Sequence, residues 1–96
     1  MKQEKTITLK TLSKSSVWDI QENDVFRLWE AAEKDNDLKD NQRRYLDIIR
    51  SAFEVEQVKV DRTEVLDKLI ERGFKIGTLR IDDKNEKFAI KKRPIM

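Results

Sequence analysis

Apolar and polar positions along the first half of the chain predict one strand followed by two helices. The two kinds of side chain alternate over residues 5–12, which is typical of a β-strand. Apolar side chains then recur at helical spacing over residues 25–32 and again over residues 45–53, so we expect two amphipathic helices there. Asp24 and Asp40 precede these stripes, and a carboxylate at the start of a helix accepts hydrogen bonds from the free N–H groups of its first turn.

The second half of the chain predicts a third helix with a well-marked end. Residues 65–70 carry an apolar stripe, and Asp61 stands three residues before Glu64, as in a variant of the capping box. Gly73 occupies the position where a helix often ends in a left-handed conformation, and Phe74 the position of the accompanying hydrophobic contact. The stretch from Val55 to Val60, before this helix, fits either a strand or a prolongation of the preceding helix.

A β-hairpin is predicted at the C-terminal end. Alternation resumes over residues 78–82 and 87–91, on either side of a polar turn at residues 83–86. Gly77 interrupts the phase of the first strand, as a β-bulge would. Pro94 ends the second strand because it has no N–H to donate.

These elements predict a single α+β domain over residues 1–96, with an N-terminal strand, about three helices and a C-terminal antiparallel β-hairpin. With 38% hydrophobic and 42% charged residues, the chain has enough apolar side chains for one modest core under a charged surface. We expect this core to contain Ile7, Leu9, Leu28, Trp29, Tyr45, Ile49, Phe53, Leu66, Leu69, Ile70, Phe74, Leu79, Ile81, Phe88 and Ile90.

The order of helices and hairpin resembles that of winged-helix proteins over residues 24–93. The resemblance lies in the order of the elements and includes no sequence motif. A strand at residues 58–60 would depart from that order, because a single helix would then precede the hairpin. The predicted N-terminal strand is also additional to it.

The composition excludes several kinds of chemistry, because the chain contains neither cysteine nor histidine. A disulfide, a thiolate zinc site and imidazole catalysis are therefore ruled out. Asp82, Asp83 and Glu86 have side chains that suit Mg²⁺, but acidic residues are also expected in a hairpin turn for local hydrogen bonds. We expect no metal, no cofactor and no catalytic residue, so the protein is predicted not to be an enzyme.

The sequence also predicts where the protein acts. No apolar run approaches the length of a membrane span, so we expect no membrane association. The first residues resemble neither a signal peptide nor a transit peptide. A cytoplasmic protein is the resulting expectation.

The net charge of +2 conceals a segregation of charge along the chain. Residues 13–37 carry three positive and seven negative side chains, whereas residues 74–96 carry seven positive and three negative ones. Basic residues on strands either bind phosphate or keep a sheet edge from pairing with other chains. If the predicted strands share one sheet, its outer face gathers Thr8, Lys10, Thr78, Arg80, Lys87 and Lys91.

The first functional hypothesis is a small, non-enzymatic regulatory protein that binds nucleic acid. Lysines of the hairpin can neutralise phosphates. The second predicted helix begins with Asn, Gln and Arg side chains, which are the types that read base edges. An ordinary solvated surface is the alternative explanation of both segments. The expected contacts are Arg43, Arg44, Arg80, Lys84, Lys87, Lys91 and Lys92.

The second hypothesis is a protein-binding module or stoichiometric inhibitor, of the kind found in mobile elements, that acts on a host nucleic-acid enzyme with a basic surface. Aromatic and acidic side chains are interleaved in the first helical region, as suits a protein interface. The alternative explanation is that the two aromatic rings cover the edge of a small core, and a homodimer is left open. The expected contacts are Trp18, Glu22, Phe26, Glu30 and Glu33.

Overall fold

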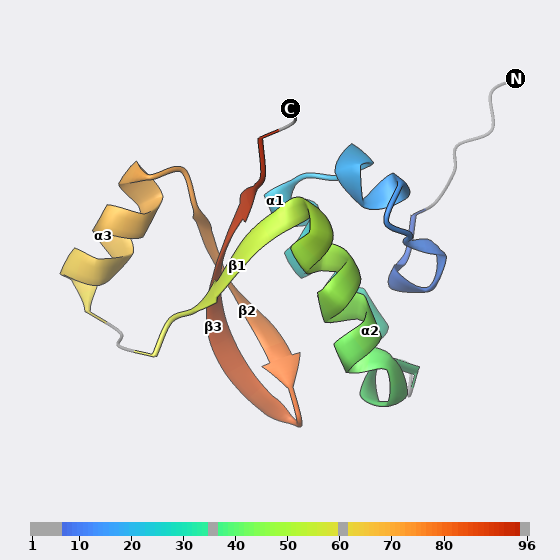
Figure 1. Ribbon diagram of the computed structural model, residues 1–96. Coiled ribbons are helices and arrows are strands. Elements are labelled where there is room, and N and C mark those ends of the chain that lie inside the picture. Colours follow the sequence, from blue (N-terminus) through green and yellow to red (C-terminus); the bar gives the residue numbers. More distant parts are fainter. Residues whose placement is uncertain (1–6, 35–36, 60–61, 95–96) are drawn as a thin grey trace, which may run out of the picture.

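Three helices and a three-stranded antiparallel sheet make up the computed structural model, which describes residues 7–34, 37–59 and 62–94 (Figure 1). The predicted α+β class, with three helices and a C-terminal hairpin, is confirmed. In chain order the elements are two 3₁₀ turns (Leu9–Thr11 and Ser16–Asp19), α1 (Glu22–Ala32), α2 (Asp37–Ala52), β1 (Phe53–Gln57), α3 (Thr63–Glu71), β2 (Lys75–Ile81) and β3 (Lys84–Lys92).

The predicted N-terminal strand is wrong over residues 7–12, and residues 5–6 lie outside the described part of the chain. Leu9–Thr11 forms a 3₁₀ turn instead. The Thr8 N–H donates to Thr11 Oγ1 at 3.0 Å, and the Thr11 hydroxyl donates to the Thr8 carbonyl at 3.1 Å. These local bonds compete with strand pairing. Leu9 and Leu12, three residues apart, are both buried, which suits a turn better than an alternating strand.

The third strand of the sheet comes from the middle of the chain. β1 follows α2 without a loop, so Phe53 begins a strand rather than ending a helix as predicted. The strand order is β1-β3-β2, with Phe53 opposite Lys92 and Val55 opposite Ile90. The Val58 N–H donates to the Lys87 carbonyl at 2.8 Å and extends the pairing, which decides between the two predictions for this stretch. Because β1 leaves α3 as the single helix before the hairpin, the winged-helix order is not present.

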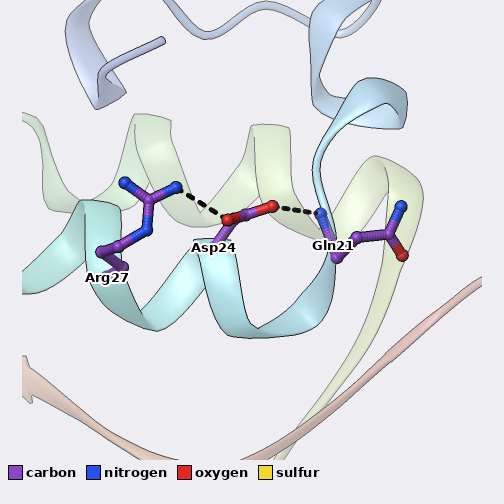
Figure 2. Close-up of polar contacts among 3 residues, drawn as sticks. All are labelled: Gln21, Asp24 and Arg27. Atoms are coloured by element: carbon purple, nitrogen blue, oxygen red, sulfur yellow. Dashed lines mark hydrogen bonds and ion pairs between the residues drawn. The ribbon is translucent and has the colours of Figure 1, made fainter. Parts of the chain in front are cut away.

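Helix α1 begins before the residue expected to cap it. The helix starts at Glu22, and the Asp24 carboxylate in its first turn accepts a hydrogen bond from the Gln21 N–H at 2.9 Å (Figure 2). The other carboxylate oxygen of Asp24 accepts one from Arg27 Nη2 at 2.7 Å. Asp24 therefore still satisfies a free N–H group at the helix start, although it lies inside the helix.

Replacing Asp24 by Ala should lower the free energy of unfolding at pH 7 by about 1 kcal/mol, since a helix-start hydrogen bond is lost. The Arg27 guanidinium and the Gln21 N–H hold the pKa of Asp24 below its ordinary value of 3.8. This stabilisation is therefore fully present above pH 3.8 and is lost as the pH falls through the lower folded-state pKa. Thermal unfolding of both proteins at pH 7 and in strong acid measures the effect. An equal difference at both pH values would contradict it.

Two other predicted helix starts differ from the structure. Helix α2 begins at Asp37 rather than at Asp40, and its backbone departs from helical geometry at Asn41, with φ −123° and ψ 16°. Helix α3 begins at Thr63, with Arg62 as its N-cap residue. Asp61, the predicted capping residue, lies outside the described residues.

The predicted end of α3 is confirmed. Gly73 has φ +97°. Its N–H donates to the Ile70 carbonyl at 2.9 Å, and the Phe74 N–H donates to the Leu69 carbonyl at 3.0 Å. These two bonds form a Schellman motif, which requires the left-handed conformation that glycine adopts without strain. Phe74 is buried, as the motif predicts.

The hairpin turn is tighter than predicted. Asp82 and Asp83 both have positive φ, at 51° and 65°, and β3 resumes at Lys84. This is the geometry of a two-residue type I′ turn, which short polar residues tolerate and which matches strand twist. The acidic residues thus belong to a turn, and the Asp82 N–H donates to the side-chain oxygen of Gln42 in α2 at 3.0 Å.

The predicted bulge at Gly77 is absent, because β2 and β3 pair in one continuous register from Lys75↔Ile90 to Ile81↔Lys84. Gly77 serves packing instead. A Cβ atom there would lie 2.6 Å from two ring atoms of Phe26 in α1, so only glycine lets this ring lie on the strand.

Helices α1 and α2 cover one face of the sheet, here called the inner face, and form the main core with it. The inner side chains of the strands include Phe53, Leu79, Phe88 and Ile90, which are all buried. Trp29 of α1 is fully buried, and its Nε1–H donates to the Arg80 carbonyl at 3.1 Å.

Helix α3 lies on the side of the sheet away from α1 and α2 (Figure 1). It packs mainly against β2 and has no buried residue. Leu66 and Leu69 are half-buried and Ile70 is 56% exposed, so their predicted place in the core is wrong. The apolar stripe of residues 65–70 is present on α3. The small sheet offers this short helix too little surface to bury the whole stripe. Ile7 and Ile81, also predicted core residues, are partly buried.

Candidate nucleic-acid interface

The outer face of the sheet carries a row of basic side chains. Directly opposite residues of antiparallel strands point to the same side. The register therefore places Arg80 beside Asn85, and Thr78 beside Lys87. Lys91 follows two positions beyond the buried Ala89. Arg80, Lys87 and Lys91, three of the predicted contacts, thus share the face that α1 and α2 leave uncovered.

Helix α3 adds two cations to this row. The Arg72 guanidinium lies 5.4 Å from the centre of the Phe74 ring, and Lys91 Nζ lies 5.9 Å from the same centre. Lys91 also passes close to Gly73, where a Cβ would lie 3.4 Å from its Cε atom. Lys68 stands one turn before Arg72 on the same flank of α3. We call Lys68, Arg72, Arg80, Lys87 and Lys91 the basic face.

The positive charges of Arg72 and Lys91 take part in no ion pair within the part of the chain that the structure describes. Among the described residues, no carboxylate lies within 4 Å of Arg72 or Lys91; the ion pairs Arg27–Asp24 and Lys39–Asp83 lie elsewhere. Each of the two cations instead packs on Phe74, an arrangement worth about 0.5–1 kcal/mol at an exposed site. Both cations therefore have no ion-pair partner among the described residues and can meet an anion from outside the molecule.

Acidic side chains border the basic face on two sides. Glu54 and Glu56 of β1 also point outward, and Glu54 stands directly opposite Lys91. On α3, Asp67 lies on the flank away from Arg72, whereas Glu64 and Glu71 stand four residues before and three residues after Lys68 and therefore lie beside it. The positive surface is therefore a strip over β2 and β3 that continues to Arg72 at the end of α3, while Lys68 lies among acidic side chains of the helix.

Two predicted hairpin contacts point to the other side of the sheet. Lys92 belongs to the inner face, where its Nζ donates to the Trp18 carbonyl at 2.8 Å and lies 5.7 Å from the centre of the Phe53 ring. Its N–H donates to the Glu22 carboxylate at 2.8 Å. Lys84 is exposed and pairs with Ile81 beside the turn, on the side of α2. Thr8 and Lys10, also expected on the outer face, lie outside the sheet.

The structure does not bring Arg43 and Arg44 to the basic face. Both are exposed on α2, which covers the inner face. Arg43 borders an open groove of about 380 Å³ between α2 and the end of β2. Its other charged residues are Lys39, Arg50, Asp40, Asp47 and Asp82, so the signs are balanced. The groove is therefore less suited to phosphate than the outer face.

The residues of the protein-binding hypothesis are partly engaged within the fold. Trp18 and Phe26 are half-buried and pack against the main core. Glu22 accepts the hydrogen bond from Lys92. Glu30 and Glu33 are exposed on α1. This arrangement favours the simpler explanation, in which the two rings cover the edge of the core.

Lys68 and Arg72 were absent from the predicted contacts. The signal for them is their spacing of four residues on a helix whose apolar stripe was recognised, which places both on one flank. Their position near β3 depends on the packing of α3 on the outer side of the sheet, which the sequence does not indicate.

Comparison with protein-family models, with curated proteins and with solved structures finds no match for this chain. Within residues 7–34, 37–59 and 62–94, the acidic side chains form no group of three that could hold a metal ion. None of the described helices has the length and apolar character needed to cross a membrane.

Proposed function

We propose that the protein is a small, non-enzymatic, cytoplasmic regulatory protein that binds nucleic acid through the basic face. The observation that carries the proposal is the meeting of Arg72 and Lys91 at Phe74 without a carboxylate partner. It joins the cations of α3 to the row on the strands. A phosphate backbone supplies a line of anions that such a strip can neutralise, with release of condensed counterions.

Helix α3 and the sheet give this strip a defined shape. Residues on β3 rise by about 3.4 Å each, so Lys87 and Lys91 are anchored about 13–14 Å apart. Lys68 and Arg72 are about 6 Å apart along their helix. The strip can therefore contact several phosphates at once, whereas a single small anion would meet one end of it.

Titration of a fluorescent DNA duplex at several salt concentrations tests the proposal. If each of the five cations meets one phosphate, the logarithm of affinity should fall with the logarithm of salt at a slope of about −4.5. Lys87→Gln and Lys91→Gln should each reduce the steepness by about 1. No binding at about 50 mM salt and micromolar protein would refute it.

A protein partner bound through Glu30 and Glu33 is the competing proposal, supported by the exposure of both carboxylates. It predicts that charge reversal at these two positions abolishes partner capture while Lys87→Gln and Lys91→Gln have no effect. Nucleic-acid binding that survives the reversal, but weakens with the lysine variants, would exclude it as the main function.

A further inference from the structure

We infer that the ligand of the basic face is duplex nucleic acid, held by its phosphates and not read by base sequence. This inference rests on the proposed function and narrows its ligand. It follows from the absence of exposed aromatic rings, from the acidic side chains on the projecting elements and from the spacing of two lysines on β3.

The basic face offers no platform for unpaired bases. Proteins that bind single strands stack successive bases on exposed aromatic rings. All seven aromatic residues of this chain are described, and none is exposed. Trp29, Tyr45, Phe53, Phe74 and Phe88 are buried, while Trp18 and Phe26 are half-buried on the α1 side of the sheet. Single strands would therefore gain charge contacts without stacking.

The elements that project from the molecule are poorly suited to enter a groove and read bases. The tip of the hairpin consists of Asp82 and Asp83, which phosphates on both sides of a groove would repel. The exposed side of α3 carries Glu64, Asp67 and Glu71 around Lys68, so its charge is mainly negative. Asn41, Gln42 and Arg43, the side-chain types that recognise base edges, lie on α2 across the sheet.

The spacing of the lysines suits a double helix. Lys87 and Lys91 are anchored about 13–14 Å apart on one strand. This separation is close to the width of the major groove, about 12 Å. Two lysines can thus reach phosphates on both strands of a duplex while the sheet stays outside the groove. Duplex RNA carries the same phosphates, but its A-form major groove is narrow, so the lysine spacing favours B-form DNA and duplex RNA serves as the comparison in the test.

The test compares equal lengths of labelled duplex DNA of A·T-rich, G·C-rich and mixed sequence, duplex RNA, and single-stranded oligo-dT. The full-length protein is titrated into each at low salt. We expect the three DNA duplexes to bind within about threefold of one another and each more tightly than the single strand, with a steeper salt slope for duplex. Binding of duplex RNA as well would assign the site to duplex phosphates in general, and its absence would restrict it to DNA.

A preference beyond threefold for one DNA duplex would overturn the inference, and so would a single strand that binds as tightly as duplex. In both cases the protein would still bind nucleic acid, so the proposed function would stand. If the protein bound none of the probes, the proposed function itself would be refuted, and the inference with it. Arg43→Gln serves as the control for base reading, and its affinities should change equally on all three DNA duplexes.

Discussion

Trp29→Ala is expected to lower the free energy of unfolding by about 3–5 kcal/mol, the range for removing a buried aromatic side chain. Trp29 is fully buried between α1 and the sheet. Its indole N–H also satisfies the Arg80 carbonyl at 3.1 Å. The substitution would therefore leave a large cavity and an unpaired acceptor on β2. Urea unfolding followed by circular dichroism measures the loss.

Trp29→Phe separates the two contributions. It keeps most of the apolar volume and removes the hydrogen bond to Arg80, so we expect a loss of about 1–3 kcal/mol from the unpaired carbonyl and imperfect packing. A loss below about 1 kcal/mol for Trp29→Ala would show that this residue does not join α1 to the sheet.

The second large effect is expected at Ile49, which is fully buried on α2. Ile49→Ala should cost about 2–5 kcal/mol through lost apolar burial and the remaining cavity. Leu69→Ala on α3 is the matched comparison. Leu69 is only half-buried, so its replacement should cost about 1 kcal/mol, the centre of the range for ordinary substitutions.

The same urea unfolding experiment compares these two variants. Equal losses for Ile49→Ala and Leu69→Ala would contradict the placement of α3 at the margin of the domain. They would mean that the apolar stripe of α3 is as well covered as the main core.

The sequence predicted local structure correctly where that structure depends on residues close together in the chain. The left-handed end of α3 at Gly73 and the alternation of the hairpin were both predicted, because each depends on neighbours along the chain. The N-terminal strand was wrong because Thr8 and Thr11 bond to each other. Phe53 was assigned to a helix because a buried residue at the junction of α2 and β1 satisfies either spacing.

The basic face was predictable only in part. Strand alternation predicted that Arg80, Lys87 and Lys91 share one face. Because side chains alternate along a strand, Lys92, the next residue after Lys91, points to the inner face instead. Which side α2 and α3 cover depends on tertiary packing. For this reason the sequence analysis wrongly assigned Arg43 to the same surface as the hairpin lysines and did not include Arg72 in that surface.

Removal of three charges from each side of the molecule tests the central claim most directly. One variant carries Arg72→Gln, Lys87→Gln and Lys91→Gln; its control carries Arg43→Gln, Arg44→Gln and Lys84→Gln, which lie away from the basic face. The net charge changes equally, and thermal unfolding verifies that both variants fold. Duplex binding across a range of salt should lose about 2.7 of its slope in the first variant and less than 1 in the control. Equal losses in the two variants would contradict the assignment of binding to the basic face.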